Sequence, residues 1–237
     1  MKVAIMQPYL LPYLGYFQLI AAVDHFVLYD DVAYIKGGWI NRNRYLSEAG
    51  AQLFTVPVQA ASSNRAINQL ELAGCPDWRR KLKLTFRQHY AKAPCFDSTM
   101  PVIEEIIDCG ETNLAAYVSN SIRRICVFIG IDTPLTLSSK LKRDASESGA
   151  DRVISIVKSL QGDTYINSAG GTHLYSPETF RAHGLSLKFL RPSPGITYSQ
   201  FGNPFVPWLS IADVFMFNPA TKIMEMLAMY ELMEGVS

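Results

Sequence analysis

The first thirty residues constrain the fold of this chain more than any other stretch. Lys2–Met6 is a short apolar run typical of a buried parallel strand, and Phe26–Tyr29 is a second such run. Between them, residues 14–23 carry apolar side chains at helical spacing. A strand, a helix and a strand in so short a stretch predict a βαβ unit, whose crossover is expected to be right-handed.

The link between this first strand and its helix contains two prolines, a glycine and three tyrosines. A simple connection of this kind needs only about 2–6 residues and no such chemistry. Pro12 suits the first turn of a helix, and Gly15 permits close approach of a ligand to the backbone. We therefore expect Gln7, Tyr9, Gly15 and Tyr16 to line the mouth of the first strand.

The remaining pattern predicts a Rossmann-like α/β fold, with a mostly parallel sheet, a β-hairpin and a helical insertion. The expected hairpin lies within residues 39–58, and Ile67–Leu72 is expected to form another short strand. Further strands are expected at 135–138, 164–167 and 185–190, and helices at 77–90, 101–109, 113–129, 150–160, 177–183, 207–217 and 221–233. We interpret the whole chain, 1–237, as one domain: βαβ unit 1–32, hairpin 33–75, helical insertion 76–130, α/β return 131–195 and C-terminal helical segment 196–237.

Composition excludes several classes of protein. The chain has 237 residues, of which 49% are hydrophobic and 18% charged, so it can bury a sizeable core. This composition is not typical of a disordered chain. A net charge of +1 gives no global electrostatic case for nucleic acid or an anionic membrane. The four cysteines lack metal-ligand spacing and predict reduced thiols rather than a metal site. Gln7, Pro8 and Pro12 interrupt the early apolar run, so we expect a cytoplasmic protein without membrane insertion.

Three polar clusters are expected at the carboxyl edge of the sheet, where open parallel sheets bind ligands. The second of them follows the second strand and contains the most candidate binding residues. Lys36, Arg42 and Arg44 are suitable partners for phosphate or carboxylate, and Gly37-Gly38 allows the backbone to approach a ligand. The same cluster offers Trp39, Asn41 and Asn43 for binding. The alternative is a solvated hairpin whose arginines face water.

Candidates for acid–base chemistry come from the ends of two strands. Asp30 or Asp31 could take a proton, although neighbours in a strand point to opposite faces and do not form an acid–base pair; the alternative is that they cap a loop. The third cluster joins Asn167, Gly170 and Gly171, which could cradle a phosphate, to His173, a second candidate base. A plain turn and a surface histidine are the alternatives here.

The N-terminal segment also resembles a known family. Its pattern is similar to that of the WbqC-like family over Gln7, Pro8, Pro12, Gly15, Tyr16, Phe17, Asp24, Phe26, Val27, Asp30, Asp31, Val32, Tyr34, Lys36, Trp39, Asn41, Arg42, Asn43 and Arg44. Later matches are Tyr90–Pro94 with Phe96, Thr164–Asn167 with Gly170-Gly171, and Phe205, Pro207, Leu209, Ser210, Ile211 and Asp213. The resemblance implies a bacterial protein of O-antigen and other surface-polysaccharide, including lipopolysaccharide, biosynthesis.

The family resemblance implies that the protein is a transferase that modifies a nucleotide-linked amino sugar. N-acyl or aminoacyl transfer to the sugar amine, such as glycyl transfer, fits that context. The nucleotide sugar would be the substrate, no cofactor or metal is assigned, and the acyl or aminoacyl donor or carrier stays open. A transfer RNA donor bound at the basic edge of residues 79–92 is the one nucleic-acid alternative.

A looser likeness leaves two other functions open. The first βαβ unit is similar to nucleotidyltransferases with an H-x-G-H motif, such as pantothenate synthetases, and Tyr13-Leu14-Gly15-Tyr16 lies where that motif would lie. Both histidines are tyrosines here, although a helix N-terminus could still face phosphates. ATP-dependent activation of a carboxylate is therefore one alternative. A non-catalytic binding component of a polysaccharide assembly system is the other.

Overall fold

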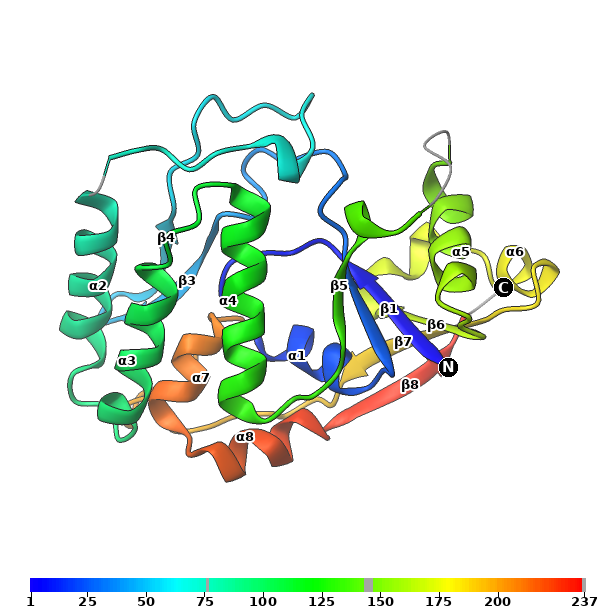
Figure 1. Cartoon of the computed structure of the whole chain (residues 1–237). Coiled ribbons are helices and arrows are strands. Elements are labelled where there is room, and N and C mark those ends of the chain that lie inside the picture. Colours follow the sequence, from blue (N-terminus) through cyan, green and yellow to red (C-terminus); the bar gives the residue numbers. More distant parts are fainter. Residues whose placement is uncertain (76, 143–146, 236–237) are drawn as a thin grey trace.

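A six-stranded sheet forms the centre of the computed structural model, which describes residues 1–75, 77–142 and 147–235 (Figure 1). The sheet has the order β5-β2-β1-β6-β7-β8, and all strands but the last are parallel. Its strands are β1 (Lys2–Met6), β2 (His25–Leu28), β5 (Leu135–Leu137), β6 (Thr164–Ser168), β7 (Ser186–Pro192) and β8 (Tyr230–Glu234). The chain runs outward from β1 to β5 and then returns to the other side of β1, which confirms the Rossmann-like α/β fold.

Alternate side chains of the strands are buried on opposite faces of the sheet. In β1, Val3 and Ile5 pack in one cluster with α5 and α6, whereas Ala4 packs in the other with α1. Because both faces of the sheet are buried, the sequences of the strands are continuous apolar runs. The covering helices are α5 (Gly149–Ser159) and α6 (Pro177–Ala182) on one face, and α1 (Leu14–Ala21), α4 (Leu114–Ile129) and α8 (Ala220–Leu227) on the other.

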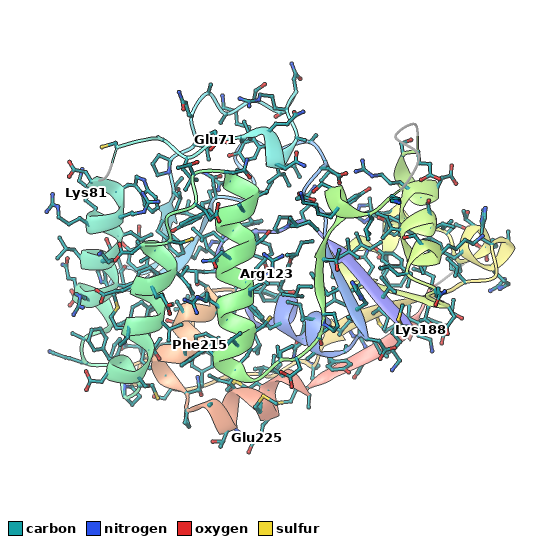
Figure 2. All side chains as sticks on the ribbon, viewed as in Figure 1. Glu71, Lys81, Arg123, Lys188, Phe215 and Glu225 are labelled. Atoms are coloured by element: carbon teal, nitrogen blue, oxygen red, sulfur yellow. The ribbon has the colours of Figure 1, made fainter. Side chains whose placement is uncertain are left out.

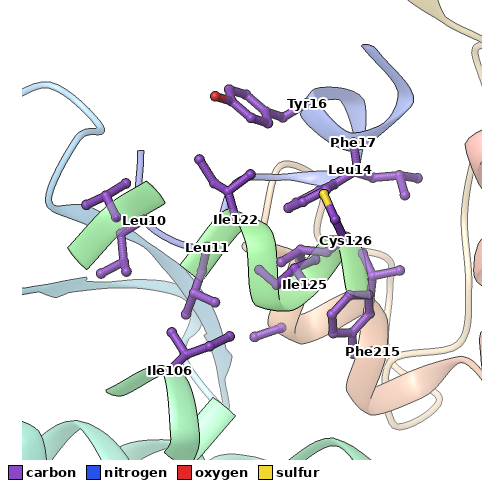
Figure 3. Packing of buried hydrophobic residues seen from close by; sticks show 14 of the residues in the cluster. Leu10, Leu11, Leu14, Tyr16, Phe17, Ile106, Ile122, Ile125, Cys126 and Phe215 are labelled. Carbon is purple, nitrogen blue, oxygen red and sulfur yellow. The ribbon is translucent and has the colours of Figure 1, made fainter. Parts of the chain in front are cut away.

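A lobe of helices and a hairpin stands beside the sheet (Figure 1). It contains β3 (Arg42–Ser47), β4 (Gly50–Thr55), α2 (Asp77–Tyr90), α3 (Phe96–Ile107) and α7 (Ile211–Phe217). The lobe and the sheet share one hydrophobic cluster, because Leu10 and Leu11 of the first loop (residues 7–13) are buried with Ile106 and Ile122 (Figure 3). Three short 3₁₀ segments complete the fold: η1 (Ile67–Gln69), η2 (Ser138–Lys140) and η3 (Ala169–Leu174).

Two predictions of secondary structure are wrong, each for its own reason. Ile67–Leu72 begins as η1 and not as a strand, and the burial of both Ile67 and Leu70 fits the three-residue repeat of a 3₁₀ turn. The expected helix 221–233 ends at Leu227, and β8 follows it. Pairing of β8 covers the edge of β7, whose backbone groups would otherwise be unpaired.

Helix starts account for several of the other differences. The expected helix 207–217 begins only at Ile211, because the Ser210 hydroxyl caps it by accepting from the backbone N–H of Ala212. The expected helix at 101–109 starts earlier, at Phe96, and so encloses its proline. Pro12 lies before the N-cap of α1, Tyr13, rather than in the first turn. Pro12 thus precedes its helix and Pro101 lies inside its helix, so neither proline takes the first helical position that proline prefers.

Candidate functional site

A cavity of about 560 Å³ lies at the carboxyl end of β1. The strand order reverses between β1 and β6, and open α/β sheets bind ligands outside the strand ends at such a point. The first loop, the segment before β3 and a distant C-terminal loop all contribute to the wall. The lining residues are Met6, Gln7, Tyr9, Tyr13, Ile35, Gly38, Trp39, Ile40, Asn43, Arg44 and Trp208. We call this the switch-point cavity.

Asn43 fixes the first loop against the hairpin. Its side-chain Nδ2 donates to the carbonyls of Leu10 and Leu11 at 3.1 and 2.7 Å, and the Leu10 N–H donates to the Ile40 carbonyl at 3.0 Å. Leu11 has a φ of +44°, which is unfavourable for a branched side chain and needs such anchoring. Asn43 thus lines the cavity and also shapes it by holding its wall.

Asn41 is buried and serves the hairpin itself. It accepts from the Tyr34 hydroxyl at 2.8 Å and donates to the Val56 carbonyl at 2.7 Å. Both hydrogen-bonding ends of the Asn41 amide are therefore engaged within the fold, and this residue does not line the switch-point cavity.

Two arginines flank Trp39 at the cavity mouth. The Arg44 guanidinium carbon lies 5.0 Å from the centroid of the Trp39 ring, and that of Arg42 lies 5.8 Å away. Arg42 is also held by its Nε, which donates to the Gly38 carbonyl at 2.8 Å. Within the described part of the chain, Arg44 has a hydrogen bond only at its backbone, so its guanidinium is a cation in the cavity lining without a protein counter-ion. Lys36 is exposed on the same segment and lies outside the lining.

Tyr9 and Tyr13 of the first loop form an aromatic wall of the cavity. The Tyr9 hydroxyl accepts from the Tyr13 N–H at 3.4 Å, and the Tyr16 hydroxyl donates to the Gln7 carbonyl at 3.2 Å. Burial raises the pKa of Tyr9 and of Tyr13, so both phenols stay protonated at neutral pH and can donate hydrogen bonds. Tyr16 packs edge-on against Tyr9 and is itself buried behind the wall.

Gly15 allows a close approach, but by Tyr13 of the same chain. A Cβ at position 15 would lie 2.5 Å from the Tyr13 hydroxyl oxygen. The Tyr13 ring therefore folds over the first turn of α1, where a phosphate would have to lie for the helix N-terminus to bind it. Gly15 is needed for the packing of the wall, and it does not line the switch-point cavity.

The Asp30-Asp31 pair joins the ends of two strands. Asp30 is 2% exposed, and its carboxylate accepts from the Ser139 hydroxyl at 2.7 Å and from the Ser138 hydroxyl at 3.0 Å. Asp31 forms an ion pair with Arg152 of α5 at 2.6 Å and also accepts from the Ser138 hydroxyl. These contacts tie the end of β2 to η2 and α5. Neither carboxylate lines the switch-point cavity.

The cluster after β6 occupies the same edge of the sheet but does not reach the cavity lining. Asn167 is buried and its Oδ1 accepts from the Ser168 N–H at 2.8 Å. A Cβ on Gly171 would lie 2.4 Å from the Asn167 Nδ2, so this glycine makes room for its own neighbour. Gly170 and His173 are exposed on η3. The geometry assigns no ligand contact to this cluster.

The basic edge of α2 is largely paired with α3 and its following turn. Arg87 forms an ion pair with Glu104 at 2.7 Å, and Lys83 forms one with Asp108, also at 2.7 Å. Arg79 donates to two backbone carbonyls, those of Ile107 and Cys109. Two of the cations that could attract a transfer RNA are thus neutralised by ion pairs, whereas Arg79 keeps its charge on neutral carbonyls.

Sequence reasoning missed Trp208, which is 64% exposed and closes the cavity from the C-terminal side. Its φ of +62° lies in the left-handed region, which a bulky residue rarely adopts without a structural or functional reason. The signal available in the sequence was a tryptophan between Pro207 and Leu209, inside a loop that had been expected to be helical. Tyr13 was also outside the predicted set, although it lies within the loop that the sequence singled out.

The fold and the site together define a doubly wound α/β protein. Its cavity lies where the strand order reverses and is lined by aromatic side chains and one cation, Arg44. The chain belongs to the WbqC-like protein family, whose model matches residues 7–225. It is 28% identical over 218 residues to the uncharacterized protein Rv1507c of Mycobacterium tuberculosis (strain ATCC 25618 / H37Rv), an alignment that covers 92% of this chain and 93% of that protein. No solved structure matches the chain. Two other findings concern residues 1–75, 77–142 and 147–235: their helices lack the length and apolarity to span a bilayer, and their His, Cys, Asp and Glu side chains form no group that could hold a metal.

Proposed function

We propose that the switch-point cavity binds a nucleotide-linked amino sugar and that the protein is a transferase that acylates or aminoacylates the sugar amine. One observation carries the proposal: the unpaired Arg44 guanidinium lies on the face of Trp39 at the mouth of an aromatic cavity. An arginine without a counter-ion is a ready partner for a phosphate. Trp39 and Trp208 offer flat apolar faces to a sugar ring or a base. Membership of the WbqC-like family supports a role in surface-polysaccharide biosynthesis.

The reaction is written as transfer from an ester or thioester of the acyl or aminoacyl group. The sugar amine nitrogen attacks the acyl carbonyl carbon and a C–N bond forms. The C–O or C–S bond to the leaving group then breaks, and the amine proton passes to the departing oxygen or sulfur. The protonated phenols of Tyr9 and Tyr13 can donate to the oxyanion of the tetrahedral intermediate.

Positioning is the main catalytic contribution in this proposal, because the lining has neither a carboxylate nor an imidazole. Asp30, buried and fully hydrogen-bonded, gains no support as the general base. Asp31 and His173 lie outside the lining. The free amine form of the sugar is already nucleophilic, so its proton can leave through water after the attack.

The experiment is binding and transfer with dTDP-linked amino sugars as probes. Arg44→Ala should weaken binding at least tenfold, because one charge-assisted contact to phosphate contributes about 1.5–3 kcal/mol. Arg44→Lys should recover part of it, because the charge remains while the two-pronged geometry is lost. Arg123→Ala is the matched control, since Arg123 is exposed on α4 and does not line the switch-point cavity (Figure 2).

Mass spectrometry of the sugar after incubation with acyl and aminoacyl thioesters and esters tests the transfer itself. A mass increase that needs the intact protein and falls with Arg44→Ala is the expected result. Equal affinity of Arg44→Ala and the unmodified chain for the nucleotide sugar would contradict the assignment of Arg44 to the phosphate site. If the nucleotide sugar still binds but no donor in a broad set gives a mass shift, the protein is a binding protein and not a transferase.

A non-catalytic binding component is the second candidate, and the same lack of an acid or base in the lining favours it. It predicts tight binding of the nucleotide sugar without turnover. It also predicts that the protein captures partners from a polysaccharide assembly system, and that Arg44→Ala abolishes this capture only if the capture requires the bound sugar. ATP-dependent carboxylate activation gains no contact here, because the Tyr13 ring covers Gly15 at the start of α1.

A further inference from the structure

The charges beside the switch-point cavity are all of one sign. Segment 33–47 lines the cavity, and segment 57–70 lies next to it, because the Tyr34 N–H donates to the Arg65 carbonyl at 2.9 Å. Neither segment contains an aspartate or a glutamate, and together they contain four cations: Lys36, Arg42, Arg44 and Arg65. The whole chain, in contrast, has 22 lysines and arginines against 21 aspartates and glutamates. Positive charge is therefore concentrated here in a chain that is nearly neutral.

None of these four cations forms an ion pair in the part of the chain that the structure describes. Several cations elsewhere are paired, as Lys83 is with Asp108. Two of the four, Lys36 and Arg65, are exposed. Unpaired charges of one sign that lie together repel one another, so contact with an anionic surface is stabilising for all four at once.

Exposed apolar side chains surround the same cavity mouth. Trp208 is 64% exposed, Ile35 54% and Trp39 43%, and all three line the cavity. Single exposed apolar residues need no explanation, but a group of them around one opening marks an interaction surface. Tryptophan is the side chain that most prefers the boundary between a bilayer and water, because its ring is apolar and its N–H is polar.

The loop that carries Trp208 is suited to an apolar environment. Segment 192–212 has no charged residue, and its part 201–208 is mostly exposed. Beneath this loop lies Gln200, which is 0% exposed and is held by the Asp213 carboxylate, to which its Nε2 donates at 2.7 Å. The same amide accepts from the Val206 N–H at 2.7 Å and donates to the Val206 carbonyl at 3.2 Å. Both backbone groups of Val206 are therefore satisfied from inside the fold, as a loop that leaves water requires.

We propose that the face around the mouth of the switch-point cavity docks on an anionic lipid surface. Trp208, Ile35 and Trp39 enter the interfacial layer, and the four cations lie among the lipid phosphates. Docking of this kind is peripheral and needs no membrane-spanning helix. It goes beyond the proposed function, because it does not depend on which substrate the cavity binds.

A nucleic acid is the other polyanion that cations and aromatic rings can bind, and the structure favours it less. A nucleic acid strand carries phosphates along its whole length, so its binding groove is positively charged along its path. Here the cations lie on one side of the cavity only, because segment 192–212 on the other side has none. An exposed, uncharged wall beside a basic one matches a lipid surface, where an apolar layer lies beneath the phosphates.

The test is co-sedimentation of the full chain with vesicles in the absence of any nucleotide sugar. Vesicles of equal parts phosphatidylglycerol and phosphatidylcholine should bind at least tenfold more tightly than vesicles of phosphatidylcholine alone. Raising the salt from about 50 mM to about 300 mM should weaken the binding, because the charges are then screened. Equal affinity for the two kinds of vesicle, or sedimentation with neither, would overturn the proposal.

Substitutions show whether this face makes the contact. Arg65→Gln should weaken binding to the phosphatidylglycerol vesicles about fivefold, the effect of one basic residue at an anionic surface. Lys81→Gln is its control, since Lys81 is exposed on α2 and does not line the cavity (Figure 2). Trp208→Ser should weaken binding about tenfold because a large apolar side chain no longer enters the interface, whereas Val127→Ser, on an exposed position of α4, should have no effect.

Vesicle binding that survives both Arg65→Gln and Trp208→Ser at full strength would mean that another face docks, and the proposal would be wrong. A single-stranded RNA of about 20 nucleotides is the competing probe. If the chain binds this RNA and not the vesicles, the surface belongs to a nucleic acid instead. Affinity for dTDP-amino sugars is measured without vesicles, so the docking surface and the proposed substrate can each fail while the other stands.

Discussion

Asparagine and arginine alternate at the start of β3, and the two residue types have different tasks. Asn41 and Asn43 are buried and hydrogen-bond to backbone carbonyls, whereas Arg42 and Arg44 lie against Trp39 on the other side. The sequence therefore predicts the location of this cluster, and strand periodicity predicts its two faces. It does not reveal which face meets a ligand, because that depends on loops that fold back from distant parts of the chain.

Asn43→Asp is expected to lower the free energy of unfolding by about 3–5 kcal/mol. A carboxylate at this position would lose two donated hydrogen bonds and would face the carbonyls of Leu10 and Leu11. Urea denaturation measures the change. Asn64→Asp is the matched control, because Asn64 is exposed, and its effect should stay within about 0.5 kcal/mol. A loss below about 1 kcal/mol for Asn43→Asp would show that the loop does not depend on this contact.

At the scale of elements, the sequence predicts the parts that local pattern determines. β1 spans Lys2–Met6 as expected, and α2 spans the expected residues 77–90, because apolar runs and helical periodicity mark them. β8 could not be predicted in this way. Four of its five residues, Tyr230–Met233, fall in the stretch expected to be helical, and it is a strand because β7 offers it an open edge.

The segment 35–40, which presents Trp39, depends on close backbone packing at Gly38. A Cβ there would lie 2.9 Å from the Ile35 carbonyl oxygen, so Gly38→Ala must displace the segment. We expect about 1 kcal/mol of lost stability and at least a tenfold loss of affinity for the nucleotide sugar. Hydrogen exchange should rise in residues 35–40 and remain unchanged elsewhere.

Gly110→Ala is the comparison for the Gly38 substitution, since a Cβ at position 110 would meet nothing within 4 Å. It should leave exchange and affinity unchanged. If Gly38→Ala keeps full affinity while residues 35–40 exchange faster, then the order of this segment does not matter for binding and the role given to Trp39 is mistaken.

At the scale of the molecule, the sheet and the helical lobe share one hydrophobic cluster. The cluster extends from Phe26 of β2 through Phe17 of α1 to Ile122 of α4 and Phe86 of α2. In Figure 3, Ile122 lies between Tyr16 of α1 and Leu11 of the first loop. The switch-point cavity is bounded by both parts, so its shape depends on their remaining docked. The interpretation of the chain as one domain predicts that they unfold together.

Cooperative unfolding can be followed by ¹⁹F NMR of the chain labelled with 5-fluorotryptophan. Its three tryptophans report on different parts, because Trp39 lies before the hairpin, Trp78 in α2 and Trp208 in the C-terminal loop. All three resonances should lose their native positions at the same urea concentration. Ile122→Ala removes a fully buried side chain from the shared cluster and should cost about 2–5 kcal/mol. With a urea dependence of about 1–3 kcal/mol/M, a loss of about 2–5 kcal/mol should lower the urea midpoint by at least about 0.7 M. The fall must be equal at all three positions. A transition that affects Trp78 alone would mean that the helical lobe folds separately, and the cavity between lobe and sheet would then be a joint between two units.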